Sequence, residues 1–86
     1  MKQVTVYTTD SCVYCRQAER FLKGRGIPFK QVDVSGDDAA RQLLVERSGG
    51  RKTVPQIFVG DQPIGGYTDM IALDRSKQLD ALLADS

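Results

Sequence analysis

The chain of 86 residues has no histidine, no tryptophan and only two cysteines. The absence of histidine excludes the cysteine–histidine hydrolases and any enzyme with a histidine general base. A structural zinc site needs four ligands, typically cysteine and histidine. Two thiols fall short of that number, and zinc would require a dimer or carboxylate ligands, so we expect no metal.

The sequence also lacks an excess of charge and a long apolar run. Its 12 basic and 11 acidic residues leave a net charge of +1, which does not favour nucleic acid or an anionic membrane as the main partner. No stretch approaches the roughly 20 apolar residues of a membrane-spanning helix. The first residues lead directly into a strand pattern without an apolar export signal, so we expect a cytoplasmic protein, and a monomer.

Hydrophobic periodicity predicts one small α/β domain over residues 1–86, with the element order βαβαββα. This order indicates a parallel strand pair joined by a helix, then an antiparallel hairpin, in a four-stranded sheet with helices on both faces. The second helix, capped by Asp37 or Asp38, carries Ala40, Leu43 and Leu44 on one side. The expected strands are residues 3–8, 29–34, 56–59 and 63–65, and the expected helices are residues 13–23, a segment from the aspartate cap to 49–50, and residues 68–84 with a break near 74–77.

The two cysteines stand at Cys12 and Cys15, where the first strand pattern gives way to the first helix pattern. Cys12 falls in the first turn of the helix, where free backbone N–H groups and the positive end of the dipole favour an anion. A thiol placed there ionises more readily, and its pKa can fall from about 8.5 into the range of roughly 3.5–7.5. Since the thiolate is the nucleophile of disulfide exchange, Cys12 is the predicted attacking cysteine.

Cys15 shares a helix face with Ala18 and Leu22, and this face is expected to pack on the sheet. It should be shielded while Cys12 is open to solvent, and positions i and i+3 are close enough for a disulfide without backbone rearrangement. A purely structural disulfide over so short a loop would constrain the unfolded chain little. Two inert core thiols conflict with the polar turn around Cys12, so the pair is interpreted as a redox-active dithiol.

Two further motifs accompany the dithiol. Pro55 precedes the apolar strand at residues 56–59, and a cis Val54–Pro55 bond beside the cysteines would turn the Val54 backbone outward to pair with an extended peptide. Residues 65–69 read Gly-Gly-Tyr-Thr-Asp and contain a helix cap, with Thr68 or Asp69 as the N-cap residue. The glycines, the Asp69 carboxylate and the helix N–H groups would also receive a small zwitterion.

Together these motifs resemble those of the glutaredoxins, specifically the small bacterial dithiol type. The resemblance covers Val-Tyr-Thr at residues 6–8, Cys-Val-Tyr-Cys at 12–15, Thr-Val-Pro-Gln-Ile-Phe at 53–58 and Ile-Gly-Gly-Tyr-Thr-Asp at 64–69. It implies the minimal thioredoxin fold, with a mixed sheet of order 2-1-3-4 flanked by three or four helices. It also implies a glutathione-dependent thiol–disulfide oxidoreductase.

By this resemblance, Cys12 attacks a glutathione mixed disulfide or a protein disulfide, and Cys15 closes the Cys12–Cys15 bond when the substrate is a protein. Glutathione is the implied reducing co-substrate, and disulfide-bonded or glutathionylated proteins, ribonucleotide reductase among them, are the implied partners. Asp69 would take the γ-glutamyl ammonium, and Arg51 or Lys52 would face the glycyl carboxylate. The residues implied to bind glutathione are Tyr14, Thr53, Val54, Pro55, Gly66, Thr68 and Asp69.

Two positions depart from the family pattern, because most dithiol members have proline where this chain has Val13 and many have lysine where it has Thr9. Stabilisation of the Cys12 thiolate is therefore expected to depend on the helix end and on Arg16, unless Arg16 is a solvated helix residue.

Two other functions stay open. A redoxin that is reduced by thioredoxin reductase and serves ribonucleotide reductase looks similar at the cysteines, but its tryptophan-containing C-terminal motif is absent here. A non-enzymatic carrier would hold a [2Fe–2S] cluster between two subunits through Cys12 and two glutathiones. In that case Cys15 would compete with the cluster for Cys12.

Overall fold

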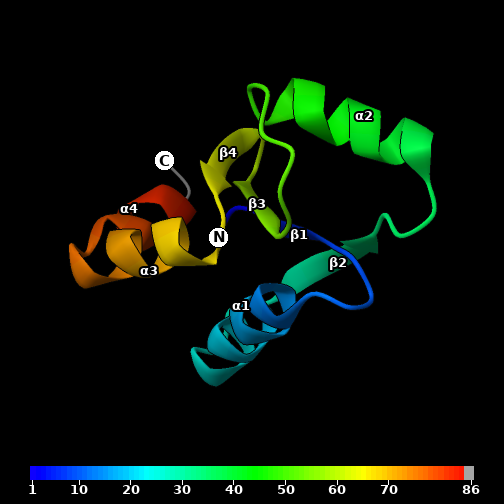
Figure 1. The fold of residues 1–86 in the computed structure, drawn as a ribbon. Helices are drawn as coiled ribbons and strands as arrows, with labels where there is room; N and C mark the ends of the chain where they lie inside the picture. Colours follow the sequence, from blue (N-terminus) through cyan, green and yellow to red (C-terminus); the bar gives the residue numbers. More distant parts are fainter. Residues whose placement is uncertain (85–86) are drawn as a thin grey trace.

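The computed structural model describes residues 1–84, and the last two residues of the predicted 1–86 domain lie outside the described part. Within residues 1–84, four strands and four helices follow one another in the order βαβαββαα, with the last predicted helix divided near the expected break (Figure 1). Most of their bounds lie within two residues of the predicted ones. No helix of residues 1–84 combines the length and apolar composition needed to cross a membrane. The strands are β1 (Val4–Thr8), β2 (Phe29–Asp33), β3 (Gln56–Val59) and β4 (Gln62–Gly65), and the helices are α1 (Val13–Gly24), α2 (Asp38–Arg47), α3 (Tyr67–Arg75) and α4 (Gln78–Leu83).

The four strands form one mixed sheet of order β2-β1-β3-β4, as predicted. β1 runs parallel to β2 and antiparallel to β3, and β3 and β4 form an antiparallel hairpin. In the β1/β3 pair, Tyr7 lies opposite Gln56. The C-terminal end of β1 and the N-terminal end of β3 therefore lie side by side at one end of the central strands, where the loop leading to Cys12 adjoins the loop at residues 53–55.

One face of the sheet carries the main core. Side chains alternate between the two faces along each strand, so Thr5, Tyr7 and Phe58 point to the opposite face, where Arg47 of α2 joins them around a shallow cleft. The rings of Tyr7 and Phe58 meet edge to face there, with centroids 5.4 Å apart. The buried side chains of the core face come from β1, α1, β3, α3 and α4 and are Val4, Val6, Ala18, Leu22, Ile57, Val59, Met70, Leu79 and Leu83.

Helix α2 is capped as predicted and buries only one of its two leucines. Asp37 is its N-cap, as predicted, and accepts a hydrogen bond from the backbone N–H of Ala40 at 3.0 Å. Leu44 is buried, whereas Leu43 is 47% exposed. Consecutive residues of a helix point about 100° apart. The strip of α2 that contacts the rest of the protein is too narrow to cover both.

Candidate active site

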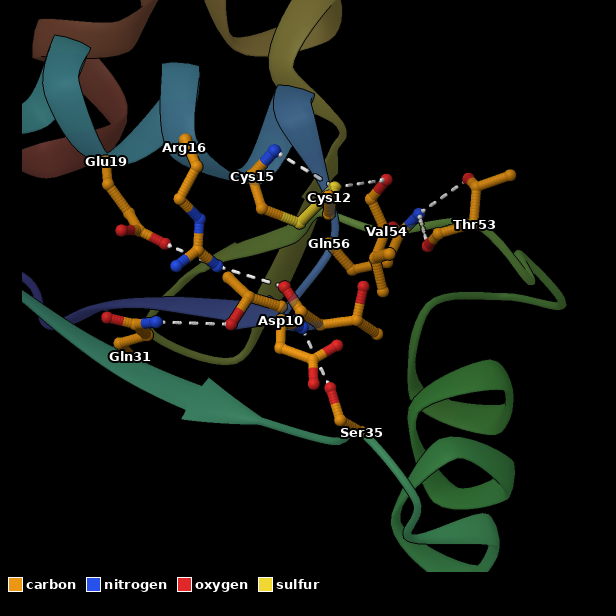
Figure 2. The surroundings of a disulfide bond; sticks show 12 residues. Asp10, Cys12, Cys15, Arg16, Glu19, Gln31, Ser35, Thr53, Val54 and Gln56 are labelled. Carbon is orange, nitrogen blue, oxygen red and sulfur yellow. Dashed lines mark hydrogen bonds and ion pairs between the residues drawn. A yellow bond between two sulfur atoms is a disulfide. The ribbon is translucent and has the colours of Figure 1, made fainter.

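The cysteine pair lies at the start of α1, directly after β1 and its loop (Figure 2). Cys12 is the N-cap residue of α1, with extended backbone at φ −100° and ψ 112°, so it lies one position before the first turn in which it was expected. Its Sγ accepts a hydrogen bond from the backbone N–H of Cys15 at 3.0 Å. A donor aimed at the sulfur from the positive end of a helix favours the ionised form of that sulfur.

The two sulfurs differ in their access to solvent, as predicted. Cys15 is fully buried on the same face of α1 as Ala18 and Leu22, whereas Cys12 is partly exposed. Their Cα atoms are 5.2 Å apart, and the two residues are joined as a disulfide. An incoming disulfide can therefore reach the sulfur of Cys12, while Cys15 is placed to react with Cys12 itself.

The loop before β3 lies against the exposed cysteine. The Val54–Pro55 peptide bond is cis, as predicted, and the Val54 carbonyl oxygen lies 3.6 Å from the Sγ of Cys12. Gln56 holds this loop in place, since its buried side-chain amide donates a hydrogen bond to the carbonyl oxygen of Thr53 at 2.8 Å. Sequence analysis missed this role of Gln56, because a polar residue beginning an apolar strand gives no sign of where its amide points.

A groove of about 350 Å³ opens between the loop at residues 53–55 and the start of α3, and its lining includes Val54, whose carbonyl oxygen lies 3.6 Å from the Cys12 sulfur. All seven residues predicted to bind glutathione line it, and so does Arg51, whereas Lys52 does not. Tyr67 also lines the groove and was missed by the sequence analysis, although its place between paired glycines and Thr68 was the available signal. Its ring stacks on that of Tyr14, with centroids 6.2 Å apart and an interplanar angle of 29°.

Asp69 lines this groove and also caps helix α3. Helix α3 begins at Tyr67 with Gly66 as its N-cap, so the expectation that Thr68 or Asp69 is the N-cap is wrong. Asp69 still caps the helix from its first turn, because its Oδ2 accepts the backbone N–H of Gly66 at 2.8 Å. The same oxygen lies 3.2 Å from Nη2 of Arg51, and both side chains are about half exposed.

Glycine is required next to this ion pair. Gly65 has φ +103°, and a Cβ at this position would collide with the Asp69 carboxylate and the Arg51 guanidinium. The strand therefore ends with backbone packed directly against the two charged groups.

Arg16 is only partly solvated, and its guanidinium is engaged rather than free. Its Nη2 donates to the carbonyl oxygen of Thr9 at 3.0 Å and lies 3.2 Å from Oε2 of Glu19. Glu19 is buried on α1, although sequence analysis gave it no role. The arginine therefore connects α1 to the loop that leads into Cys12.

Two other features of residues 1–84 bear on the chemistry of the protein. No group of three or more histidine, cysteine, aspartate or glutamate side chains suited to a metal ion is found among these residues. The cleft on the opposite face of the sheet, lined by Thr5, Tyr7 and Arg47 among others, has a volume of about 480 Å³ and is larger than the groove. The groove is nevertheless the candidate active site, because its lining includes Val54, whose carbonyl oxygen lies 3.6 Å from the Cys12 sulfur.

Known proteins share this arrangement over most of the chain. Residues 4–64 match the glutaredoxin family. Glutaredoxin 3 of Escherichia coli K12 is 43% identical over 83 residues, which make up 96% of this chain and 99% of that protein. The solution structure of glutaredoxin from Brucella melitensis is 41% identical, with a TM-score of 0.83 over 96% of this chain and 89% of that one. The crystal structure of a buckwheat glutaredoxin–glutathione complex shares the fold at 24% identity, with a TM-score of 0.85 over 93% of this chain and 74% of that one.

The match in sequence and the match in fold lead to the same conclusion. The dithiol at Cys12 and Cys15 begins the first helix of a four-stranded sheet whose strand order is the one that the family resemblance implied. The family match spans more than half of the chain, and the bacterial relatives match it nearly end to end. The chain belongs to the glutaredoxin family and is a thiol–disulfide oxidoreductase.

Proposed function

We propose that this protein reduces glutathione mixed disulfides and protein disulfides, with Cys12 as the nucleophile, Cys15 as the resolving cysteine and glutathione as the reducing co-substrate. The observation that carries the proposal is the position of the Cys12 sulfur. It accepts a hydrogen bond from the N–H of Cys15 at the helix start and lies 3.6 Å from the carbonyl oxygen of Val54, which lines the groove.

For a mixed disulfide between glutathione and another thiol, the Cys12 thiolate attacks the glutathione sulfur. A Cys12–glutathione disulfide forms, the original S–S bond breaks, and the other thiol leaves as a thiolate that takes a proton from solvent. A second glutathione thiolate then attacks the glutathione sulfur of this intermediate. Glutathione disulfide is released, the Cys12 thiolate is regenerated, and the sequence does not require Cys15.

For a protein disulfide, the first attack joins Cys12 to the substrate protein. The thiolate of Cys15 then attacks the Cys12 sulfur, which forms the Cys12–Cys15 disulfide and releases the second substrate thiolate. Two glutathione molecules reduce this disulfide and leave as glutathione disulfide. The Cα separation of 5.2 Å and the burial of Cys15 support this division of roles, because only Cys12 is within reach of a bulky partner.

The groove offers groups that complement the charges of glutathione. The Asp69 carboxylate is suited to the γ-glutamyl ammonium, and the N–H groups at the start of α3, beside Thr68, are suited to the adjoining carboxylate. Arg51 is the cation within the groove that can meet a second carboxylate, which favours it over Lys52. The edge at Thr53, Val54 and the cis Pro55 would pair with the extended peptide backbone, as in β-strand addition, while Tyr14 and Gly66 complete the walls.

We further propose that residues 1–86 act as one domain, as a monomer, in the cytoplasm, where a dithiol is kept in exchange with the thiol pool. The partners proposed are glutathione and proteins with accessible disulfides or glutathionylated cysteines, ribonucleotide reductase among them.

The test is a glutathione-coupled assay in which the reduction of a small glutathione mixed disulfide and of a protein disulfide is followed through glutathione reductase and NADPH. Cys12→Ser should abolish both activities, and Cys15→Ser should retain the first and lose the second. A parallel assay with thioredoxin reductase should show no turnover. Turnover only with thioredoxin reductase, or full activity of Cys12→Ser, would overturn the proposal.

A further inference from the structure

One peptide group in the loop before Cys12 is held at both of its ends. The carbonyl oxygen of Thr9 accepts Nη2 of Arg16 at 3.0 Å. The N–H of Asp10, which belongs to the same peptide group, donates to Oγ of Ser35 at 2.8 Å. Figure 2 shows Arg16 and Ser35 reaching the segment around Asp10 from different elements of the fold. One anchor comes from α1 and the other from the turn between β2 and α2.

Each anchor is itself fixed. The Arg16 guanidinium is paired with Glu19, whose carboxylate is buried, and the ion pair joins Nη2 of Arg16 to Oε2 of Glu19 at 3.2 Å. Ser35 is held by Asp33, whose Oδ1 accepts the backbone N–H of Ser35 at 2.8 Å. Hydrogen bonds from the backbone and the hydroxyl of Ser35 lower the pKa of Asp33, and the charge of Arg16 lowers it further.

We propose that Arg16 and Ser35 are positioning residues that act through the Thr9–Asp10 peptide group to hold the Cys12 sulfur on the N–H of Cys15. The proposal rests on the nucleophilic role of Cys12 proposed above. Neither Arg16 nor Ser35 makes a hydrogen bond or an ion pair with the Cys12 sulfur among the described residues. Both instead hold the Thr9–Asp10 peptide group, which lies shortly before Cys12 in the chain. Arg16 thereby affects the sulfur through the loop geometry and not as a counter-ion.

The physical reason is that the hydrogen bond from the Cys15 N–H to the Cys12 sulfur is sensitive to small shifts of Cys12. Cys12 has extended, non-helical backbone, so no helical hydrogen bond of its own N–H fixes it, and its direction depends on residues 9–11. The hydrogen bond from Cys15 N–H weakens steeply as its length or angle departs from 3.0 Å and near-linear geometry. A loop that moves by a fraction of an ångström therefore loses part of the stabilisation of the thiolate.

The test compares Arg16→Met and Ser35→Ala with Arg20→Met, which removes an exposed arginine from the same helix. The rate of alkylation of reduced Cys12 by iodoacetamide is measured against pH, and kcat and KM are measured with the mixed disulfide. We call the two hydrogen bonds that hold the Thr9–Asp10 peptide group the clamp. Loss of either one should raise the pH midpoint of alkylation and lower kcat by about three- to tenfold, with KM unchanged. Arg16→Lys keeps a donor and should recover part of the loss, and Arg20→Met should match the wild type.

The double variant Arg16→Met/Ser35→Ala adds a second criterion. Two hydrogen bonds at opposite ends of one peptide group polarise each other, so the double variant should lose less than the product of the single losses. Strictly multiplicative losses would show that the two residues do not act through one peptide group. An alkylation profile and kcat equal to those of Arg20→Met, with only the Tm lowered, would reduce both residues to a structural role and overturn the proposal.

Alkylation needs neither glutathione nor turnover. A protein that is inactive with glutathione but whose Cys12 alkylation still responds to the clamp would refute the proposed function and retain this inference. If Arg16→Met does not fold because Glu19 is left buried and unpaired, Ser35→Ala alone decides the question, since Ser35 makes no buried ion pair.

Discussion

Replacement of Asp69 by asparagine separates the charge of this side chain from its role as a helix cap. Asp69 accepts the Gly66 N–H at 2.8 Å and pairs with Arg51 at 3.2 Å through the same oxygen. Asparagine keeps an oxygen that can accept the Gly66 N–H but loses the negative charge. If glutathione places its ammonium on this carboxylate, Asp69→Asn should raise the KM for glutathione and leave the helix intact.

The size of the effect follows from the exposure of the site and from Arg51. A hydrogen bond to a charged group contributes about 1.5–3 kcal/mol in a shielded setting. The Asp69 side chain is 44% exposed, and exposed ion pairs contribute only about 0–1 kcal/mol. In the free protein Arg51 already occupies the carboxylate, and a ligand ammonium has to compete with it. We therefore expect a loss near 1 kcal/mol, which corresponds to a rise of about fivefold in KM.

The assay is steady-state turnover with glutathione as the varied substrate, coupled to glutathione reductase. Asp61→Asn, which neutralises an exposed aspartate at the cleft on the opposite face, is the matched control and should leave KM unchanged. The alkylation profile of Cys12 should also be unchanged in Asp69→Asn. A lowered Tm with an unaltered KM would refute the reasoning, because Asp69 would then act only as a helix cap.

Three further predictions concern the nucleophile, the core and acid stability. Thr9→Lys should bring a cation near the sulfur and lower the pKa of Cys12, which would appear as faster iodoacetamide labelling at mildly acidic pH; an unchanged or slower rate would contradict this. Leu22→Ala should lower the free energy of unfolding by about 2–5 kcal/mol in urea titrations, whereas Leu43→Ala on the exposed face of α2 should cost far less. The Asp33 carboxylate has a lowered pKa in the folded protein, so its contribution to stability is present above the ordinary aspartate pKa and is lost as the pH falls through the folded value. Asp33→Asn should therefore flatten the decline of stability in acid, and an unchanged acid limb in pH-dependent melts would contradict the assignment.

The sequence predicted the elements and the cysteine asymmetry because each follows from local patterns, whereas the sheet order was implied by the family resemblance. The spacing of Cys15, Ala18 and Leu22 on one helix face is a property of the chain alone, and the structure buries all three. The motif containing Val54 and Pro55 was placed beside the cysteines by family resemblance. Periodicity alone would not have brought together segments about forty residues apart.

The features that the sequence could not decide depend on tertiary contacts. Leu43 and Leu44 are both apolar, and only the width of the contact between α2 and the remaining fold decides which is buried. The start of α3 moved to Tyr67 because the backbone of Gly66, rather than a hydroxyl or carboxylate at the N-cap, precedes the first turn. The links from Arg16 to Thr9 and from Ser35 to Asp10 join residues that no sequence period relates.

The pairing of β1 with β3 has a consequence for how this enzyme tolerates mutation. Cys12 follows β1 and Val54 precedes β3, and these strands are aligned by a ladder in which Val6 lies opposite Ile57. A slip by one residue would turn the side chains of a strand to the other face and shift its end by about 3.3 Å. The distance between the Cys12 sulfur and the loop at Val54 is therefore set by the packing of β1 against β3 in the core. Substitutions deep in the sheet should be selected against for lost turnover even where the protein still folds.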